Sequence, residues 1–380
     1  MAVMASVLLI HTAAFGAGYE YPGEDPGYEE VITKGKVLKI ENAAAENDLG
    51  DVGIPLTVQE IEVEITSGDY KGRVLNVENH LMDDPGYDII VEEGDRVELF
   101  LEVNNGSIEA AYITSYDRSV YAFYLAAAFI IVLLVVGGIK GLKATVSLAV
   151  MVFLIFKVLI PYMLKGYSPI MLSVVVTVIS TVVTLMLIGG VTVKSFSAII
   201  GTAGGVLTAA GIAVAVGKVA RLTGMGAEEA RMLLYIPQGI EFDFQGLLFA
   251  GIIIGSLGAV MDVSMSVASS MDEVKHANPK IPTGNLIKSG MNVGRDIMGT
   301  MSNTLILAYT GASIPLLLVL FAYDNTLSSV LNLDFITTEV VRSLAGSIGL
   351  IMTIPLTAFV TGYLEKYNTA KTSSREDVST

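Results

Sequence analysis

The sequence lacks cysteine and tryptophan altogether and has only three histidines. Without cysteine there is no disulfide and no thiolate metal site, so an exported domain would be held together by burial alone. The three histidines, His11, His80 and His276, lie far apart, and the metalloprotease, P-loop and serine-hydrolase motifs are missing. We therefore expect no enzymatic activity, no cofactor and no metal site.

Charge is scarce and unevenly placed. Charged residues make up 16% of the 380 residues against 52% apolar residues, and the mean hydropathy is +0.63. Residues 20–118 hold 24 acidic and 7 basic residues, a net charge of −17, while the rest of the chain carries +2. No basic surface exists for a nucleic acid, and the long apolar runs exclude a soluble protein. The composition predicts a polytopic membrane protein, embedded in the lipid bilayer, with one acidic domain facing water.

The N-terminal residues 1–18 resemble a signal peptide. The apolar run from Ala2 to Ile10 has the length of a signal-peptide core and is too short to span a bilayer. We expect cleavage near Gly16 to Gly18, although no Lys or Arg precedes the run, and a retained short anchor is the alternative. Residues 19–30 form an acidic linker rich in proline and glycine.

Residues 31–118 carry the pattern of a small β domain. Five short alternating runs are separated by turn signals, among them Asn104-Asn105-Gly106, an expected hairpin. The runs are 31–40, 58–66, 71–78, 96–103 and 108–115. Ile61, Val63 and Ile65 alternate with glutamates, which predicts one buried and one acidic face. Five short strands need closure to hide their edges, so we expect a small barrel of OB-like type on the extracytoplasmic side.

Residues 119–365 contain seven apolar segments of spanning length, followed by a tail at 366–380. The segments are 120–139, 142–164, 169–190, 196–217, 246–268, 300–322 and 341–363. The expected fold is therefore an α-helical bundle of about seven transmembrane helices behind an all-β exported domain. Gly201, Gly204 and Gly205 make the fourth segment a candidate for close packing or for a broken helix.

The basic residues of the short loops set the expected orientation. With the barrel outside, ten Lys or Arg residues of the loops and tail are cytoplasmic and five are outside, which follows the positive-inside rule. This places the protein in the cytoplasmic (inner) membrane with its C-terminus inside. The loop from Gly217 to Gln245 carries three basic residues on the outside, so we expect either that it is partly re-entrant or that the fourth segment does not cross fully.

Two polar stripes stand out in the fifth and sixth segments. The first follows helical steps of three or four through Gly251, Gly255, Gly258, Asp262, Ser266, Ser269 and Glu273, and the second through Asn292, Asp296, Gly299 and Asn303, with Arg295 beside it. We expect the two stripes to meet at one membrane depth and to form a path for a small solute or ion.

Each feature of these stripes has an alternative interpretation. We expect Gly251, Gly255 and Gly258 to serve helix packing rather than to line a path, because Gly251 and Gly255 form a G-x-x-x-G pair. Asp262 and Arg295 are expected either to form a structural ion pair or to take part in transport. An intramembrane aspartyl dyad of Asp262 and Asp296 is a further alternative, but the Gly-x-Gly-Asp motif of such proteases is absent around both residues.

Three motifs resemble the YibE/F-like family of bacterial membrane proteins. They are Leu233–Pro237, Gly251–Val263 and Ser289–Tyr309, supported by Tyr70-Lys-Gly and Val77–His80 in the β domain. The resemblance implies a multi-pass inner-membrane protein with a suspected transporter or permease role, and it supplies no substrate and no catalytic residue. We expect a transporter-like protein; the alternative is a membrane scaffold or sensor whose acidic domain binds a partner.

Overall fold

The computed structural model describes residues 28–44, 57–81, 84, 86, 88–236, 241–323 and 326–379. The chain forms two compact units, an N-terminal one ending at Ile131 and a C-terminal one beginning at Val132. The first holds five strands and the start of a helix, and the second is helical. The expected signal peptide and most of the linker lie outside the described residues.

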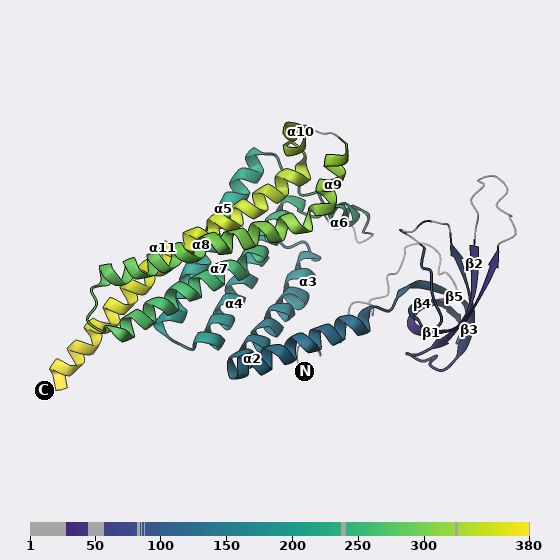
Figure 1. Cartoon of the computed structure of the whole chain (residues 1–380), viewed down its shortest axis with the longest axis horizontal. Coiled ribbons are helices and arrows are strands. Elements are labelled where there is room, and N and C mark those ends of the chain that lie inside the picture. The colour runs from purple at the N-terminus through teal and green to yellow at the C-terminus, as the bar shows by residue number, and fades with distance from the viewer. Residues whose placement is uncertain are drawn as a thin grey trace. The chain divides into compact units, whose positions relative to one another are not determined.

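Five antiparallel strands form a nearly closed barrel (Figure 1). They are β1 (Glu29–Ala44), β2 (Thr57–Ile65), β3 (Val74–Leu81), β4 (Arg96–Asn104) and β5 (Ser107–Tyr116). Their order is β3-β2-β1-β4-β5, and β3 also contacts β5. The expected five-stranded barrel is confirmed, but β3 begins three residues later than predicted, because Gly68 and Gly72 take φ values of +72° and +86° and turn the chain first.

The strand phase follows the predicted alternation. Ile61, Val63 and Ile65 are at most 1% exposed, whereas the intervening Glu62 is exposed. Gly35 in β1 has no room for a side chain, since a Cβ atom there would lie 2.4 Å from Val63 Cγ1. This close approach lets the long β1 strand pair with both β2 and β4 across a tightly packed interior. The Asn104-Asn105-Gly106 hairpin is also confirmed, with positive φ at Asn105 and Gly106.

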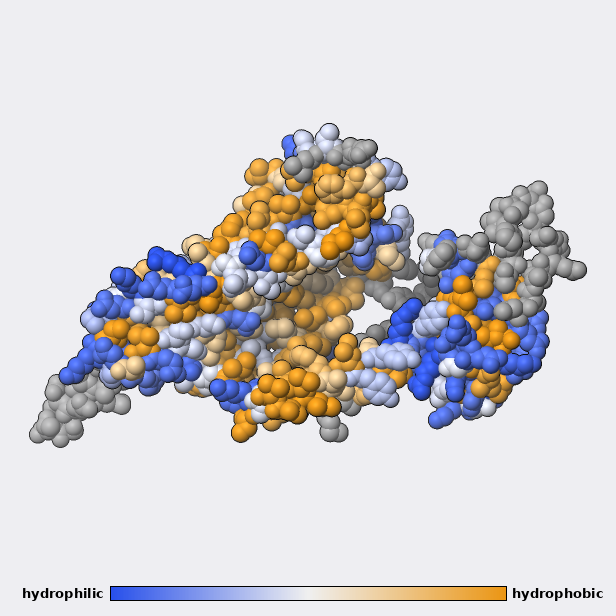
Figure 2. Space-filling view, in the orientation of Figure 1, coloured by the Kyte–Doolittle hydropathy of each residue, from blue (hydrophilic) through white to orange (hydrophobic). Residues whose placement is uncertain are grey.

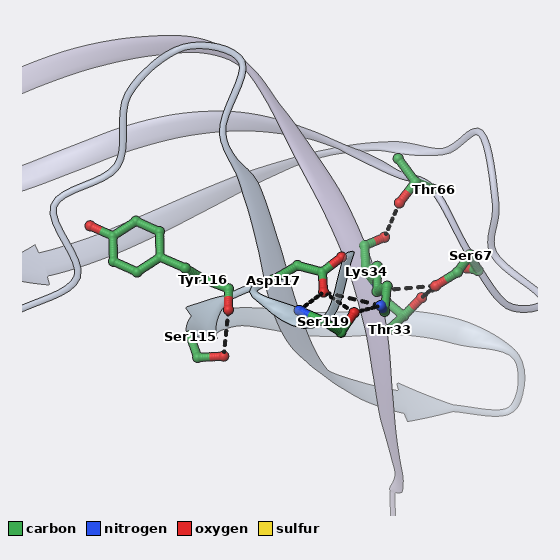
Figure 3. Close-up of polar contacts among 8 residues, drawn as sticks. All are labelled: Thr33, Lys34, Thr66, Ser67, Ser115, Tyr116, Asp117 and Ser119. Atoms are coloured by element: carbon green, nitrogen blue, oxygen red, sulfur yellow. Dashed lines mark hydrogen bonds and ion pairs between the residues drawn. The ribbon is translucent and has the colours of Figure 1, made fainter. Parts of the chain in front are cut away.

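A buried carboxylate joins the barrel to the first helix (Figure 3). Asp117 follows β5 and is 6% exposed; it accepts hydrogen bonds from Lys34 Nζ of β1, at 3.0 Å, and from Ser119, where α2 begins. Burial alone would raise the pKa of Asp117, but the hydrogen bonds from Ser119 and Lys34 and the nearby ammonium charge hold that pKa below its ordinary value. Asp117 is therefore a charged anchor between β1 and the start of α2.

The helical unit consists of long helices with short breaks. The elements are α2 (Ser119–Leu154), the π-helical turn η1 (Ile155–Leu159), α3 (Ile160–Met163), α4 (Pro169–Gly189), α5 (Val193–Val219), α6 (Glu228–Met232), η2 (Leu233–Tyr235), α7 (Phe244–Ala277), α8 (Thr283–Ala312), α9 (Ile314–Ala322), α10 (Leu327–Leu331) and α11 (Asp334–Ser379). α7 is central and packs against α4, α5, α8 and α11. Ile253, Val260 and Met271 of α7 are fully buried in the main apolar cluster.

Helices α5 and α11 approach each other unusually closely. A Cβ atom on Gly201 would lie 1.9 Å from Thr357 Oγ1, and one on Gly205 would lie 2.8 Å from the carbonyl oxygen of Gly349. The helix α5 is continuous from Val193 to Val219. Of the two expectations for these glycines, close packing is therefore the correct one and a broken helix is not.

Within the described part of the chain, five helices are long and apolar enough to cross a membrane, or six if α8 and α9, which meet at 60°, form one span. Ser119–Met163 counts as one of these helices, although the sequence predicts two spans there. Within this stretch Gly138 has non-helical φ and ψ of 53° and −129°. A Cβ atom on Gly141 would lie only 2.0 Å from the carbonyl oxygen of Leu133, so the backbone turns back on itself at this point.

The loop that follows α5 is anchored at the end of the helical bundle. Thr223 donates hydrogen bonds from its backbone N and its Oγ1 to the carboxylate of Asp334, the first residue of α11, at 3.2 and 2.7 Å. Gln245 Nε2 donates to the carbonyl oxygen of Leu222 at 2.8 Å. The described part of this loop thus lies beside the N-terminal ends of α7 and α11, and a re-entrant course is not needed to explain it.

Candidate functional site

The two predicted stripes lie on exposed faces of α7 and α8. Sixteen of the 34 residues of α7 are buried, whereas Gly251, Gly255, Gly258, Asp262 and Ser266 are all exposed. On α8 the exposed residues include Asn292, Arg295, Asp296, Gly299 and Asn303. Figure 2 shows blue and pale patches over α8 and α7 on a helical unit that is otherwise largely orange. The stripes therefore form a polar face, defined by these ten residues, on the surface of the bundle.

The antiparallel contact of α7 with α8 fixes which residues share a depth. Met271 lies against Gly290, while Ser256 and Leu305 lie against the same glycine, Gly346 of α11. By this register Gly299 is level with Asp262, and Arg295 is level with Ser266. The two stripes therefore cover the same range of depths.

The expected ion pair between Asp262 and Arg295 is not formed. Along the helix axis Arg295 lies one turn away from the level of Asp262, about 6 Å at 1.5 Å per residue. Arg295 Nη1 instead donates a long hydrogen bond of 3.5 Å to Asn292 Oδ1 on its own helix. Among the described residues neither Asp262 nor Arg295 has an ion-pair partner.

Asp262 is close to the middle of the bundle in depth. Its neighbour in sequence, Val260, packs against Gly205, which is near the midpoint of α5. An ionised carboxylate at this depth costs several kcal/mol unless water or a protein partner surrounds it. Asp262 therefore needs water or protein in front of it.

The three stripe glycines differ in what they face. A Cβ atom on Gly255 would lie 2.3 Å from the hydroxyl of Tyr309, so this glycine packs against α8. Gly251 and Gly258 have no atom within 4 Å of such a Cβ. The packing role expected for these two has no partner helix within the described residues.

The aspartyl dyad receives no support from the geometry. Asp262 and Asp296 lie on neighbouring helices and both are exposed, but no hydrogen bond joins their carboxyl groups in the part of the chain that the structure describes. A dyad that shares a proton needs its carboxyl groups in direct contact.

Sequence reasoning missed a buried polar cluster where α5, α7 and α11 meet. Ser264 Oγ donates to the carbonyl oxygen of Ala198 at 2.7 Å and lies 2.9 Å from Thr357 Oγ1. Thr353 Oγ1 donates to the carbonyl oxygen of Gly201 at 2.5 Å. The signal in the sequence is the four-residue step of Thr353, Thr357 and Thr361 in an apolar segment, which is typical of interhelical hydrogen bonds. The cluster is fully hydrogen-bonded and buried, so it fixes the helices.

The chain forms a barrel followed by a bundle of long apolar helices, and one of these helices carries near its middle a carboxylate that has no ion-pair partner among the residues described. This arrangement defines an integral membrane protein with a separate folded domain. A family model described as YibE/F-like protein matches residues 125–367, and one described as YibE/F family N-terminal domain matches residues 29–116. The chain therefore belongs to the YibE/F-like family, and the resemblance seen in its motifs is confirmed. No curated protein and no solved structure gives a significant match.

Proposed function

We propose that this protein is a transporter-like protein of the cytoplasmic membrane that moves a small polar solute or ion along the polar face of α7 and α8, without enzymatic activity. The observation that carries the proposal is Asp262, an exposed carboxylate near the middle of a spanning helix with no ion pair among the described residues. Ionisable residues at such depths are rare and by default mark substrate or ion paths.

A seven-span topology accompanies this proposal. The helical stretch Ser119–Met163 has 45 residues, about 68 Å of helix, which is more than twice the hydrocarbon core of about 30 Å. The turn at Gly138, with Lys140 and Lys143 just after it, fits a cytoplasmic reversal between two spans. With α8 and α9 as one broken span, the total is seven, the barrel is outside and the C-terminus is inside.

The test compares Asp262→Asn with Glu273→Gln, a neutralised acid at the end of the same stripe. Metabolites that change with expression of the wild-type protein are first identified in cells, and their uptake is then measured in proteoliposomes. We expect Asp262→Asn to keep its abundance and melting temperature but to lose at least tenfold in uptake, because the amide has the same size without the charge. Glu273→Gln should behave as wild type.

Normal uptake by Asp262→Asn at normal abundance would contradict the proposal. A loss of folded protein in both Asp262→Asn and Arg295→Gln would instead indicate that the two charges stabilise the fold.

A scaffold or sensor role is the second candidate, and one feature of the barrel favours it. Ile32, Phe100 and Tyr112 pair across β1, β4 and β5, and the rings of Phe100 and Tyr112 lie 6.3 Å apart. Ile32 and Tyr112 are about half exposed, so they form an apolar patch on an acidic domain, a feature typical of partner binding. If Tyr112→Ser abolished the cellular phenotype while Asp262→Asn preserved it, the scaffold role would be favoured.

A further inference from the structure

We propose that the polar face of α7 and α8 is an interface between two copies of this chain, arranged about a twofold axis along the membrane normal. The inference goes beyond the transport proposal, because it holds whether or not a solute passes along the face.

The first argument is that the chain itself does not cover charged groups at this depth. Asp262, Arg295 and Asp296 are exposed and, within the described residues, make no ion pair. Elsewhere α7 is covered by four helices. Asp262 lies within the apolar segment 246–268, and Arg295 is level with Ser266 of the same segment. Lipid tails cannot solvate charges at this depth, so another protein surface or enclosed water has to face them.

The second argument is that the face is complementary to itself. A twofold axis along the membrane normal keeps every residue at its own depth, and the same patch meets itself. Arg295 and Asp296 are adjacent in sequence and both exposed. Arg295 of each copy then meets Asp296 of the other copy, which gives two reciprocal ion pairs from one pair of residues. A different partner protein would have to supply this matched pattern independently.

The third argument is that the face leaves room for close approach. Gly251 and Gly258 have nothing within 4 Å of an added Cβ, although both lie on the exposed line that passes through Asp262. Exposed small residues at helical spacing allow two helix backbones to pack directly. The dimer would place one Asp262 from each copy on the same path and would shield both from lipid, so the site is incomplete in one copy.

The test uses the natural lack of cysteine in the chain. Gly258→Cys is placed on the face, and Ile348→Cys is the control; Ile348 is 41% exposed on α11 and is level with Gly258, because Gly346 lies against Ser256. Oxidation in native membranes should cross-link most of the Gly258→Cys protein into a covalent dimer and leave Ile348→Cys monomeric. Equal cross-linking at both positions, or none at Gly258→Cys, would overturn the proposal.

A second arm measures the number of copies by single-molecule photobleaching in nanodiscs. Gly258→Leu should lower the dimer fraction at least tenfold while the protein remains folded, since the single chain has space for the side chain. Arg295→Asp should also abolish the dimer, and the exchange Arg295→Asp with Asp296→Arg should restore it. The interface would be refuted if Gly258→Leu left the dimer fraction unchanged. It would also be refuted if one copy of this chain were found together with an equal amount of a different protein. These measurements do not depend on transport, so the two proposals can fail separately.

Discussion

At the scale of single residues, Asp117 shows how one buried carboxylate connects two parts of the chain. It lies 83 positions from Lys34 in sequence, and both side chains belong to the N-terminal unit. Asp117 N also donates to the carbonyl oxygen of Arg96 at 2.8 Å, so backbone and side chain hold the same turn. The last residues of the barrel are therefore fixed before α2 begins.

The lowered pKa of Asp117 gives a prediction with a definite sign. The pKa of the Asp117 carboxyl group is lower in the folded state than in the unfolded state, where it is about 3.9. Ionised Asp117 therefore stabilises the fold at pH values above the unfolded pKa, and this stabilisation is lost as the pH falls through the folded pKa. Asp117→Asn should cost about 1–2 kcal/mol near pH 7, and the difference from wild type should shrink below about pH 4.

Amide hydrogen exchange of β1 and β5 in the full chain, corrected for the intrinsic pH dependence of exchange, measures this difference. Asp69→Asn removes an exposed acid of the same barrel and is the matched control, which should follow the wild type at every pH. If Asp117→Asn and Asp69→Asn gave the same pH profile, the assigned anchor role would be wrong.

Residues of this kind mark the limit of prediction from the sequence. The phase of β2 was predictable because apolar and acidic residues alternate within a few positions. The anchor of Asp117 was not predictable, because it depends on a partner in a distant strand. The missing ion pair of Asp262 and Arg295 has the same cause: both helix faces follow from the periodicity, but the one-turn offset depends on the register of α7 against α8.

At the scale of elements, the contact of α5 with α11 determines how tightly the bundle packs. The sequence indicated a glycine-rich stretch but left packing and breakage open, since the outcome depends on the helix opposite. That helix supplies Gly349, Thr353 and Thr357, which combine small size with hydrogen-bonding groups. The start of β3 was misplaced for a similar reason: Lys71 to Arg73 directly precede an alternating run, but Gly68 and Gly72 turn the chain.

The glycines of α5 give a matched pair of substitutions. Gly201→Leu should lower the melting temperature by at least 5 °C, or prevent folding, because its Cβ alone would lie 1.9 Å from Thr357 Oγ1. Gly211→Leu lies ten residues further along the same helix, where nothing is within 4 Å, and should be tolerated. Thermal unfolding in detergent, followed by size-exclusion chromatography, measures both. Equal sensitivity at the two positions would contradict the close contact of α5 and α11.

At the scale of the whole molecule, helix direction agrees with alternate crossing of a membrane. α5 is antiparallel to α7, because Gly201 lies against Ser264 and Gly205 against Val260. It is also antiparallel to α11, because Gly201 lies against Thr357 and Gly205 against Gly349. α8 is antiparallel to α11, because Gly294 lies against Ile354 and Gly346 against Leu305. The loop after α5 and the start of α11 therefore share one end of the bundle, which the hydrogen bonds between Thr223 and Asp334 also require.

This arrangement makes the topology testable with single cysteines and a membrane-impermeant maleimide on intact cells. Asp69→Cys in the barrel, Ser168→Cys before α4 and Glu229→Cys in the loop after α5 are all exposed and should be labelled from outside. Lys280→Cys, exposed between α7 and α8, should be protected until the cells are opened. Ser195 is unsuitable as an inside probe because it is completely buried.

The position of Glu229 makes this test more stringent than a count of basic residues. Its loop carries the three basic residues that depart from the positive-inside rule, and the structure fixes that loop at the same end as the start of α11. Labelling of Asp69→Cys and Glu229→Cys together with protection of Lys280→Cys requires an even number of crossings between the barrel and the loop. If the helical segments on either side of Gly138 are two spans, the stretch Ser119–Met163 crosses the membrane twice, whereas a single span would cross it once. Protection of Glu229→Cys with labelling of Asp69→Cys would show that Ser119–Met163 crosses only once and that the seven-span topology is wrong.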